Sequence, residues 1–154
     1  METRVVERLL EKGFHIAFAE SCTGGLLCAR IVNVPNASAV LDSSFVTYAN
    51  TAKMKYLGVK EETIASYGVV SEAVAGQMAK GVARECKAQV GVATSGIAGP
   101  SGGTETKPVG MVCFGFWVNG ELTTVTKQFG DIGRNQVRAA AVTYALETLY
   151  ELLS

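Results

Sequence analysis

Hydrophobic and polar positions along the chain follow two spacings that alternate, one helical and one extended. Residues 2–12 place apolar side chains at helical spacing before Gly13, which predicts an amphipathic helix that ends at this glycine. Residues 14–19 form an apolar run with strand-like alternation, and helical spacing resumes from about Thr23 to Val32. The pattern therefore predicts a helix, a buried strand, a tight turn and a second helix.

The middle of the chain continues in the same way. Residues 40–48 and 89–94 have the apolar, β-rich composition of strands. A short helix is expected between them, capped by Asn50 and closed by Gly58, and another short helix is expected over residues 60–67. A longer helix begins near Ser71, and its apolar side chains recur at i+4 spacing, at Val74, Met78, Val82 and Cys86.

The last third of the chain carries a hairpin signal. Two β-rich runs, residues 109–118 and 122–129, flank Asn119-Gly120, and Asn-Gly is the strongest short-range sign of a β-hairpin. A final helix is expected from Arg134 to Leu153. The whole pattern predicts an α/β fold, a three-layer α/β/α sandwich with a mixed sheet that includes a C-terminal β-hairpin.

Composition narrows the class of protein. The 154 residues are 48% hydrophobic and 18% charged, which predicts a single domain over residues 1–154. Fourteen basic and fourteen acidic residues give no net charge, which argues against nucleic acid as a partner. No apolar run is long enough to cross a bilayer, so we expect no membrane association and a cytoplasmic location. The sequence leaves open whether the chain forms a homo-oligomer.

The turn after the first strand is the strongest candidate site. It places Ser21, Cys22 and Thr23 before Gly24-Gly25, where a helix would begin with unpaired N–H groups and the positive end of its dipole. In open α/β sheets such strand-to-helix turns bind ligands. The alternative is that Ser21 only caps the helix and that the glycines only allow the turn.

The histidine and cysteine positions argue against a histidine base for Ser21, a metal site and a disulfide. His15 is the only histidine and lies six residues before Ser21 on the same strand, roughly 20 Å away, so it cannot act as its base. A hydrolase here would need lysine, tyrosine or a carboxylate in that role. The four cysteines form no C-x-x-C pair and no acidic or histidine cluster has ligand spacing, so no metal and no disulfide is indicated. We expect solvated surface charges at Lys107, Lys127 and Arg138.

Three loops follow predicted strands, at residues 20–25, 48–53 and 94–104. If these strands are parallel neighbours, the three loops meet at one edge of the sheet. Each loop is rich in hydroxyls, glycines and small polar groups. Such a set suits a substrate with an anionic group and a polar planar head, because backbone N–H groups and hydroxyls bind phosphate.

Four ordered motifs resemble the C-terminal domain of the CinA competence/damage-inducible protein family. They are residues 19–25 (AESCTGG), residues 46–50 (VTYAN) with Lys53, residues 68–72 (GVVSE), and residues 95–100 (SGIAGP) with residues 107–110 (KPVG). The resemblance covers about residues 5–152. It implies a free-standing copy of this domain, without an N-terminal molybdopterin-binding-like domain.

The resemblance implies a cofactor-free nicotinamide-nucleotide amidase, which hydrolyses nicotinamide mononucleotide to nicotinic acid mononucleotide and ammonia in pyridine-nucleotide salvage. By motif, Ser21 would be the nucleophile and Lys53 its base, with Tyr48 close by. If Asn50 caps its helix, Lys53 lies at position N3, where the dipole lowers its pKa by less than about one unit and burial must supply the rest. The residues implied to hold the nucleotide substrate or its oxyanion are Thr23, Gly24, Gly25, Ser95 and Gly96.

The sequence departs from the family pattern at two places and leaves two alternative hypotheses open. Residues 43–45 (SSF) stand where the family usually has glycine, and residues 130–134 (GDIGR) carry an insertion in a Gly-Asp-Arg segment. The insertion leaves open whether Arg134 reaches the substrate phosphate. One rival is a non-catalytic module that binds a nucleotide or a protein partner in DNA uptake or damage response. The other is Cys22 as nucleophile, which lacks a nearby histidine to activate it.

Overall fold

A five-stranded sheet forms the middle layer of the computed structural model, which describes all 154 residues. Its strand order is β2-β1-β3-β4-β5, with β1 parallel to both β2 and β3, and β4 antiparallel to β3 and β5. The sheet is therefore mixed, as the sequence predicts, and it is open. The strands are β1 (Ile16–Glu20), β2 (Phe45–Val46), β3 (Val90–Gly96), β4 (Met111–Val118) and β5 (Glu121–Gln128).

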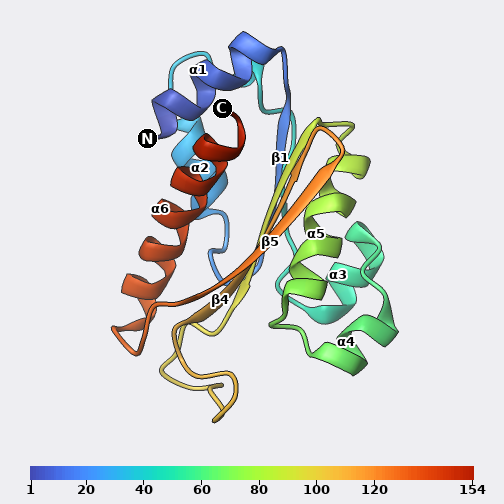
Figure 1. The fold of residues 1–154 in the computed structure, drawn as a ribbon, viewed down its shortest axis with the longest axis vertical. Coiled ribbons are helices and arrows are strands. Elements are labelled where there is room, and N and C mark those ends of the chain that lie inside the picture. The colour runs from blue at the N-terminus through green and yellow to red at the C-terminus, as the bar shows by residue number, and fades with distance from the viewer.

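Helices cover both faces of the sheet, which gives the predicted three-layer sandwich (Figure 1). Three helices lie on one face, namely α1 (Glu2–Lys12), α2 (Leu26–Val32) and α6 (Arg134–Leu152). On the other face α5 (Glu72–Glu85) contacts β1, β3 and β4. The remaining two helices, α3 (Asn50–Leu57) and α4 (Glu61–Tyr67), pack against α5.

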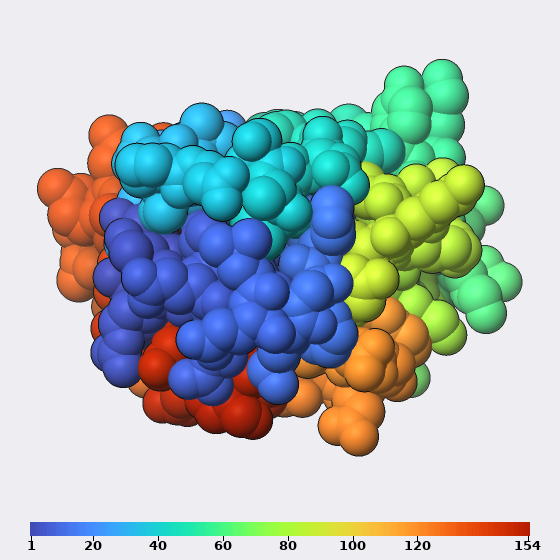
Figure 2. All heavy atoms as spheres, turned by 90° about the horizontal axis from the view of Figure 1, so that it is seen from above, coloured from blue at the N-terminus to red at the C-terminus, as the bar shows by residue number.

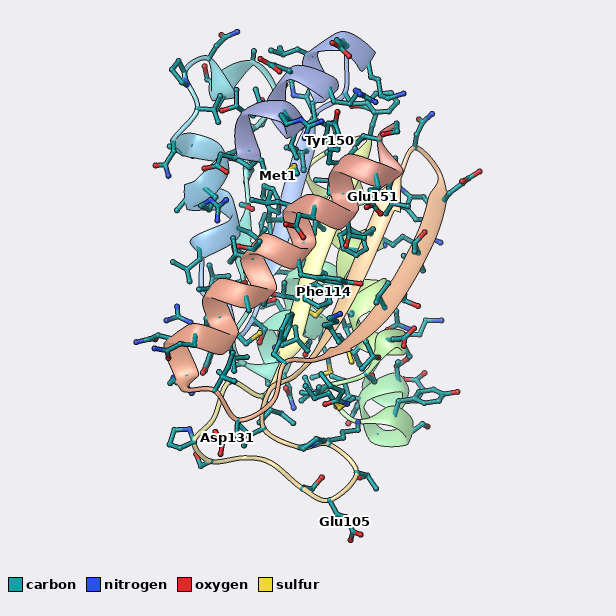
Figure 3. The ribbon with its side chains drawn as sticks, turned by 60° about the vertical axis from the view of Figure 1, so that its left-hand side comes forward. Met1, Glu105, Phe114, Asp131, Tyr150 and Glu151 are labelled. Carbon is teal, nitrogen blue, oxygen red and sulfur yellow. The ribbon has the colours of Figure 1, made fainter.

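The short strand β1 is buried on both faces, which explains its continuous apolar sequence. Ile16 and Phe18 belong to the larger hydrophobic core under α1, α2 and α6, whereas Ala17 and Ala19 belong to the core under α5. Phe114 of β4 lies near the centre of the larger core, under α6 (Figure 3). The turn of residues 20–25, which follows β1, is thus attached to a strand that is buried along its whole length.

Local signals at the ends of elements are confirmed. Gly13 and Gly58 end α1 and α3 in the left-handed conformation, which glycine adopts without steric cost. Ser71 caps α5, since its hydroxyl accepts the Val74 N–H at 3.2 Å. The hairpin turns at Asn119-Gly120, where both residues have positive φ, as a two-residue turn of this type requires.

The second strand is much shorter than the predicted residues 40–48. Only Phe45–Val46 pair with β1, and Leu41 makes a single isolated bridge with Ile16. Ser44 explains the gap, because its hydroxyl accepts the Phe18 N–H and donates to the Phe18 carbonyl, each at 2.9 Å. A side chain therefore satisfies the backbone groups that a neighbouring strand would otherwise pair.

Two helix starts also differ from the prediction. Helix α2 begins at Leu26 rather than near Thr23, because Gly24 and Gly25 have positive φ values of 57° and 102°. Helix α3 has Ala49 as its N-cap residue, and Asn50, the expected cap, is its first helical residue. Lys53 is consequently one position further into the helix than the sequence indicated.

The topology separates the loop-rich end of the molecule from its two termini. The parallel order β2-β1-β3 brings the carboxyl ends of these strands to one edge, and the long loop between β3 and β4 lies at that end (Figure 1). Both chain ends lie toward the opposite end (Figure 1), where the N-terminal and C-terminal segments are neighbours in the view from above (Figure 2). No helix of the structure has the length and apolar character that a bilayer crossing requires.

Candidate active site

A pocket of about 470 Å³ lies where the three strand-end loops meet. Ser21 and Cys22 enter it from the loop after β1, Tyr48 and Lys53 from the loop after β2 and from α3, and Arg134 from the start of α6. Ser95 and Gly96, at the end of β3, also line it. The Glu105 tip of the β3–β4 loop and Asp131, just before α6, mark the same end of the molecule (Figure 3).

Ser21 and Lys53 form a hydrogen-bonded pair in this pocket. The Lys53 Nζ atom lies 3.0 Å from Ser21 Oγ, 2.7 Å from the Thr47 carbonyl oxygen and 3.1 Å from the Tyr48 carbonyl oxygen. A neutral amine has two N–H donors and one lone pair. The two carbonyls can accept both donors, which leaves the lone pair for the Ser21 hydroxyl proton.

Burial favours the neutral form of the Lys53 amine, which this arrangement requires. The side chain is 1% exposed, and this burial lowers the pKa of Lys53 from 10.5 to about 8, because an ammonium is costly to remove from water. Position N4 of α3 places Lys53 beyond the N3 position expected for it. Burial rather than the helix dipole is therefore the main cause of the shift.

Ser21 has no structural role as a helix cap, so that alternative is wrong. The N-cap residue of α2 is Gly25, and Ser21 makes its only side-chain hydrogen bond with Lys53. Gly24 and Gly25 do supply the positive φ values that the turn requires. The Ser21 N–H donates to the Thr94 carbonyl at 3.2 Å, which fixes the turn of residues 20–25 to β3.

Glu20 performs the capping role instead, and the sequence reasoning missed it. Its carboxylate is 1% exposed and accepts the N–H groups of Leu27 at 2.9 Å and Cys28 at 3.0 Å. The Thr23 hydroxyl donates to the same carboxylate at 2.6 Å. A lone acidic residue at the end of an apolar strand, directly before a helix, was the available signal.

The structure separates the other implied binding residues into two groups. Ser95 and Gly96 line the pocket, and the Ser95 hydroxyl donates to the Val69 carbonyl at 2.8 Å. Thr23, Gly24 and Gly25 do not line it, and the Thr23 hydroxyl lies inside the protein, 2.8 Å from Thr94 Oγ1. Any contact of this second group with a substrate would have to come from the main chain.

Arg134 connects two of the loops at the pocket. Its guanidinium donates to the Gly99 carbonyl at 2.7 Å and to the Tyr48 hydroxyl at 3.1 Å. Both partners also line the pocket. The insertion before α6 therefore leaves Arg134 at the site, with its guanidinium hydrogen-bonded to the Tyr48 hydroxyl.

Two of the three expected surface charges are instead structural. Lys107 lines the pocket and donates to the carbonyls of Tyr67 and Val70, the second at 2.7 Å. Arg138 donates to the Cys22 carbonyl at 2.9 Å. Lys127 is exposed, with its ammonium 5.3 Å from the centre of the Tyr144 ring, as a surface charge should be. Lys107 and Arg138 bind backbone carbonyls that would otherwise be unpaired, and a sequence does not reveal such carbonyls.

Cys22 is a poor nucleophile in this environment. All four cysteines are free thiols, and burial raises the pKa of Cys22 to about 11, so at neutral pH it is the unreactive thiol. No three His, Cys, Asp or Glu side chains cluster closely enough to form a metal site.

The fold and the site define an α/β protein with a serine–lysine pair at the carboxyl edge of a mixed sheet. The chain belongs to the CinA C-terminal domain family, whose model matches residues 1–153. It is 48% identical over 150 residues to a protein of Caldicellulosiruptor saccharolyticus that is provisionally named a competence-damage inducible protein, covering 97% of this chain and 36% of that protein. It is 45% identical over 147 residues to a CinA-like protein of Kosmotoga olearia, covering 96% of this chain and 35% of that protein. The chain thus spans about a third of these relatives.

Solved structures with the same fold are also similar in sequence. The competence/damage inducible protein CihA from Agrobacterium tumefaciens has a TM-score of 0.96 and 42% identity, covering 99% of this chain and 93% of that one. A CinA superfamily protein from Escherichia coli has a TM-score of 0.94 and 34% identity, covering 98% of this chain and 87% of that one. Their names refer to competence and damage and mention no reaction.

Proposed function

We propose that the chain is an amidohydrolase that converts nicotinamide mononucleotide to nicotinic acid mononucleotide and ammonia through a serine acyl-enzyme. The observation that carries the proposal is the pairing of Ser21 Oγ with the buried Lys53 amine at 3.0 Å. A serine hydroxyl is a weak nucleophile until an adjacent base removes its proton. Lys53, with its pKa lowered to about 8, is such a base near neutral pH.

In the acylation step, the Ser21 oxygen attacks the carboxamide carbon while its proton passes to the Lys53 amine. The tetrahedral intermediate then collapses, the C–N bond breaks, and the Lys53 ammonium gives its proton to the departing nitrogen, which leaves as ammonia. The Thr47 and Tyr48 carbonyls hold the amine in place during both transfers. An ester between Ser21 and the nicotinoyl group remains.

In the deacylation step, water attacks the ester carbon and loses a proton to the same amine. The ester C–O bond breaks, Ser21 recovers its proton, and the carboxylic acid product is released. One residue therefore serves as base and acid in both halves of the reaction. No cofactor is needed for these steps.

The pocket suits a phosphorylated aromatic substrate. Its lining includes Lys107 and Arg134, besides the Lys53 amine, and no aspartate or glutamate, so an anionic group is favoured. A guanidinium is well shaped to bind phosphate oxygens. Tyr48 is 63% exposed at the pocket, which leaves its ring face free to stack on a flat, positively charged pyridinium.

Ammonia release from nicotinamide mononucleotide by the purified chain tests the proposal. We expect turnover with this substrate, a stoichiometric amount of nicotinic acid mononucleotide, and none of either product with the Ser21→Ala variant. Tight binding of the nucleotide by the wild-type chain without ammonia release would contradict the proposal. That result would instead favour the non-catalytic nucleotide-binding module.

A further inference from the structure

The turn of residues 20–25, which carries the proposed nucleophile Ser21 and is called the nucleophile turn below, pairs its main-chain carbonyls more completely than its N–H groups. The carbonyls of residues 20–23 all have donors, namely the Thr47 N–H, the Gly24 N–H, and Arg138 for both Cys22 and Thr23. The N–H groups of Cys22 and Thr23, in contrast, donate to no other residue of the chain. Buried N–H groups are almost always paired, and of these two residues only Cys22 lines the pocket, so its unpaired N–H is the donor that a ligand in the pocket could use.

Peptide geometry links these free donors to the carbonyls. In a trans peptide the C=O and the following N–H point in opposite directions. The Gly24 N–H holds the Ser21 carbonyl at 3.0 Å, which fixes the direction of the Cys22 N–H. Arg138 holds the Cys22 carbonyl at 2.9 Å, which fixes the direction of the Thr23 N–H. Both peptide planes that flank Cys22 are therefore set by hydrogen bonds.

Of the two free donors, the Cys22 N–H belongs to the residue that lines the pocket. The N–H of the residue after a serine nucleophile is well placed to meet the oxyanion, because that oxygen develops on the carbon that the serine attacks. Preorganised donors of this kind are worth most when they need not move during the reaction.

We propose that Arg138 is a positioning residue for the oxyanion site, which rests on the proposed function. From α6 it holds the next two peptides of the nucleophile turn through the Cys22 and Thr23 carbonyls. It thereby keeps the shape of the turn, in which the bond between the Gly24 N–H and the Ser21 carbonyl directs the Cys22 N–H at the oxygen of the tetrahedral intermediate. Arg138 does not touch the substrate. Its effect reaches the reacting atoms only through the turn.

The arginine side chain is itself held in place on three sides. Its Nε donates to Cys22, its Nη2 donates to the Thr23 carbonyl at 3.3 Å, and its Nη1 donates to Asn135 Oδ1 at 3.2 Å. A Cβ at Gly24 would lie 3.2 Å from Nη2, so the turn fits closely around the guanidinium. Lysine has a single nitrogen and no planar fork, so it cannot present separate donors to the two carbonyls and to Asn135 in this geometry.

Steady-state kinetics of Arg138→Ala with nicotinamide mononucleotide form the first test. Loss of one oxyanion donor costs about 10²–10³ in kcat, so a misplaced donor should lower kcat by at least about tenfold while KM changes by less than about threefold. Arg8→Ala is the matched control, because Arg8 also donates to a carbonyl, that of Leu153, at the far end of the molecule. We expect it to retain wild-type kcat.

Chemical rescue separates positioning from general damage to the fold. Free guanidinium ion at millimolar concentration should restore part of the kcat of Arg138→Ala, whereas ammonium should not, because only guanidinium reproduces the fork. A kcat for Arg138→Ala within about twofold of wild type would overturn the inference. An equal loss in kcat for folded Arg8→Ala would also overturn it.

A second measurement distinguishes failure of this inference from failure of the proposed function. A fluorophosphonate probe reacts with an activated serine, forming a phosphorus–oxygen bond to Ser21 Oγ and releasing fluoride, and the phosphonyl oxygen occupies the oxyanion site. If the wild-type chain is labelled but does not hydrolyse the nucleotide, slower labelling of Arg138→Ala supports the inference while the proposed substrate fails. If the nucleotide is hydrolysed and labelling of Arg138→Ala is as fast as that of wild type, the inference alone fails.

Discussion

The Nζ atom of Lys53 lies 3.0 Å from the Oγ atom of Ser21, although 32 residues separate them in the chain. The pairing depends on the parallel order of β2 and β1, which brings the loop before α3 beside the nucleophile turn. It also depends on the burial of Lys53, whose amine forms hydrogen bonds only with two main-chain carbonyls and the Ser21 hydroxyl. The predictions below test this arrangement.

Ser21→Ala should lower amidase activity by more than about a thousandfold and leave the fold intact. The Ser21 hydroxyl bonds only with Lys53 and does not cap α2, so its loss removes about 1 kcal/mol or less of stability. Ammonia release and thermal unfolding measure the two effects. Ser71→Ala is the opposite case, because loss of the α5 cap should cost about 1 kcal/mol and keep activity.

Lys53→Arg should lower kcat by at least about a hundredfold, because arginine keeps the charge but does not release a proton in the working range. In the wild-type chain, kcat should rise with pH and level off above about pH 8, where the neutral amine predominates. A pH–rate profile of both proteins measures this. Lys53→Met serves as a second variant if arginine does not fit, and retention of most of the wild-type kcat by a folded variant would transfer the base role to Tyr48.

Stability should also depend on Lys53 between about pH 8 and pH 10.5. In this interval the unfolded chain binds a proton at Lys53 that the folded chain has released, so the free energy of unfolding rises with pH. The slope relative to Lys53→Met is at most about 1.4 kcal/mol per pH unit. Denaturant unfolding at several pH values measures it, and parallel curves for the two proteins would refute the lowered pKa.

Arg134→Ala should raise KM much more for nicotinamide mononucleotide than for nicotinamide riboside, which lacks the phosphate. The guanidinium lies at the pocket, between the Gly99 carbonyl and the Tyr48 hydroxyl, where a phosphate can receive its donors. Kinetics with the two substrates test the role. Equal increases in KM would show that Arg134 acts only by joining the two loops.

Dialysis against a chelator should leave the amidase rate unchanged. The serine–lysine pair supplies a nucleophile and a base, and the chain has no cluster of three metal-ligating side chains. A rate that falls after dialysis and returns with added zinc or manganese would contradict the mechanism.

The sequence by itself determined the elements whose causes are local. Glycine at positions 13 and 58, serine at position 71 and Asn-Gly at the hairpin act through the conformation and hydrogen bonds of their own neighbours. The alternation of strands and helices determined the layers, and the family motifs pointed to Ser21, Lys53 and Tyr48 as candidate site residues. These residues meet at one edge because β2, β1 and β3 are parallel neighbours. The sequence pattern did not determine this strand order, so it predicted the meeting only if the strands were arranged in that way.

The tertiary structure alone decided which side chains serve the site and which serve the fold. Thr23 turns inward to Glu20, whereas Arg138, expected at the surface, holds the turn from 116 residues away. Lys107 likewise binds carbonyls 37 and 40 residues distant. Each of these side chains donates to backbone carbonyls that would otherwise lack a hydrogen-bond donor. Such unpaired carbonyls come near the side chain only after distant segments have packed together, so neither periodicity nor composition reveals them.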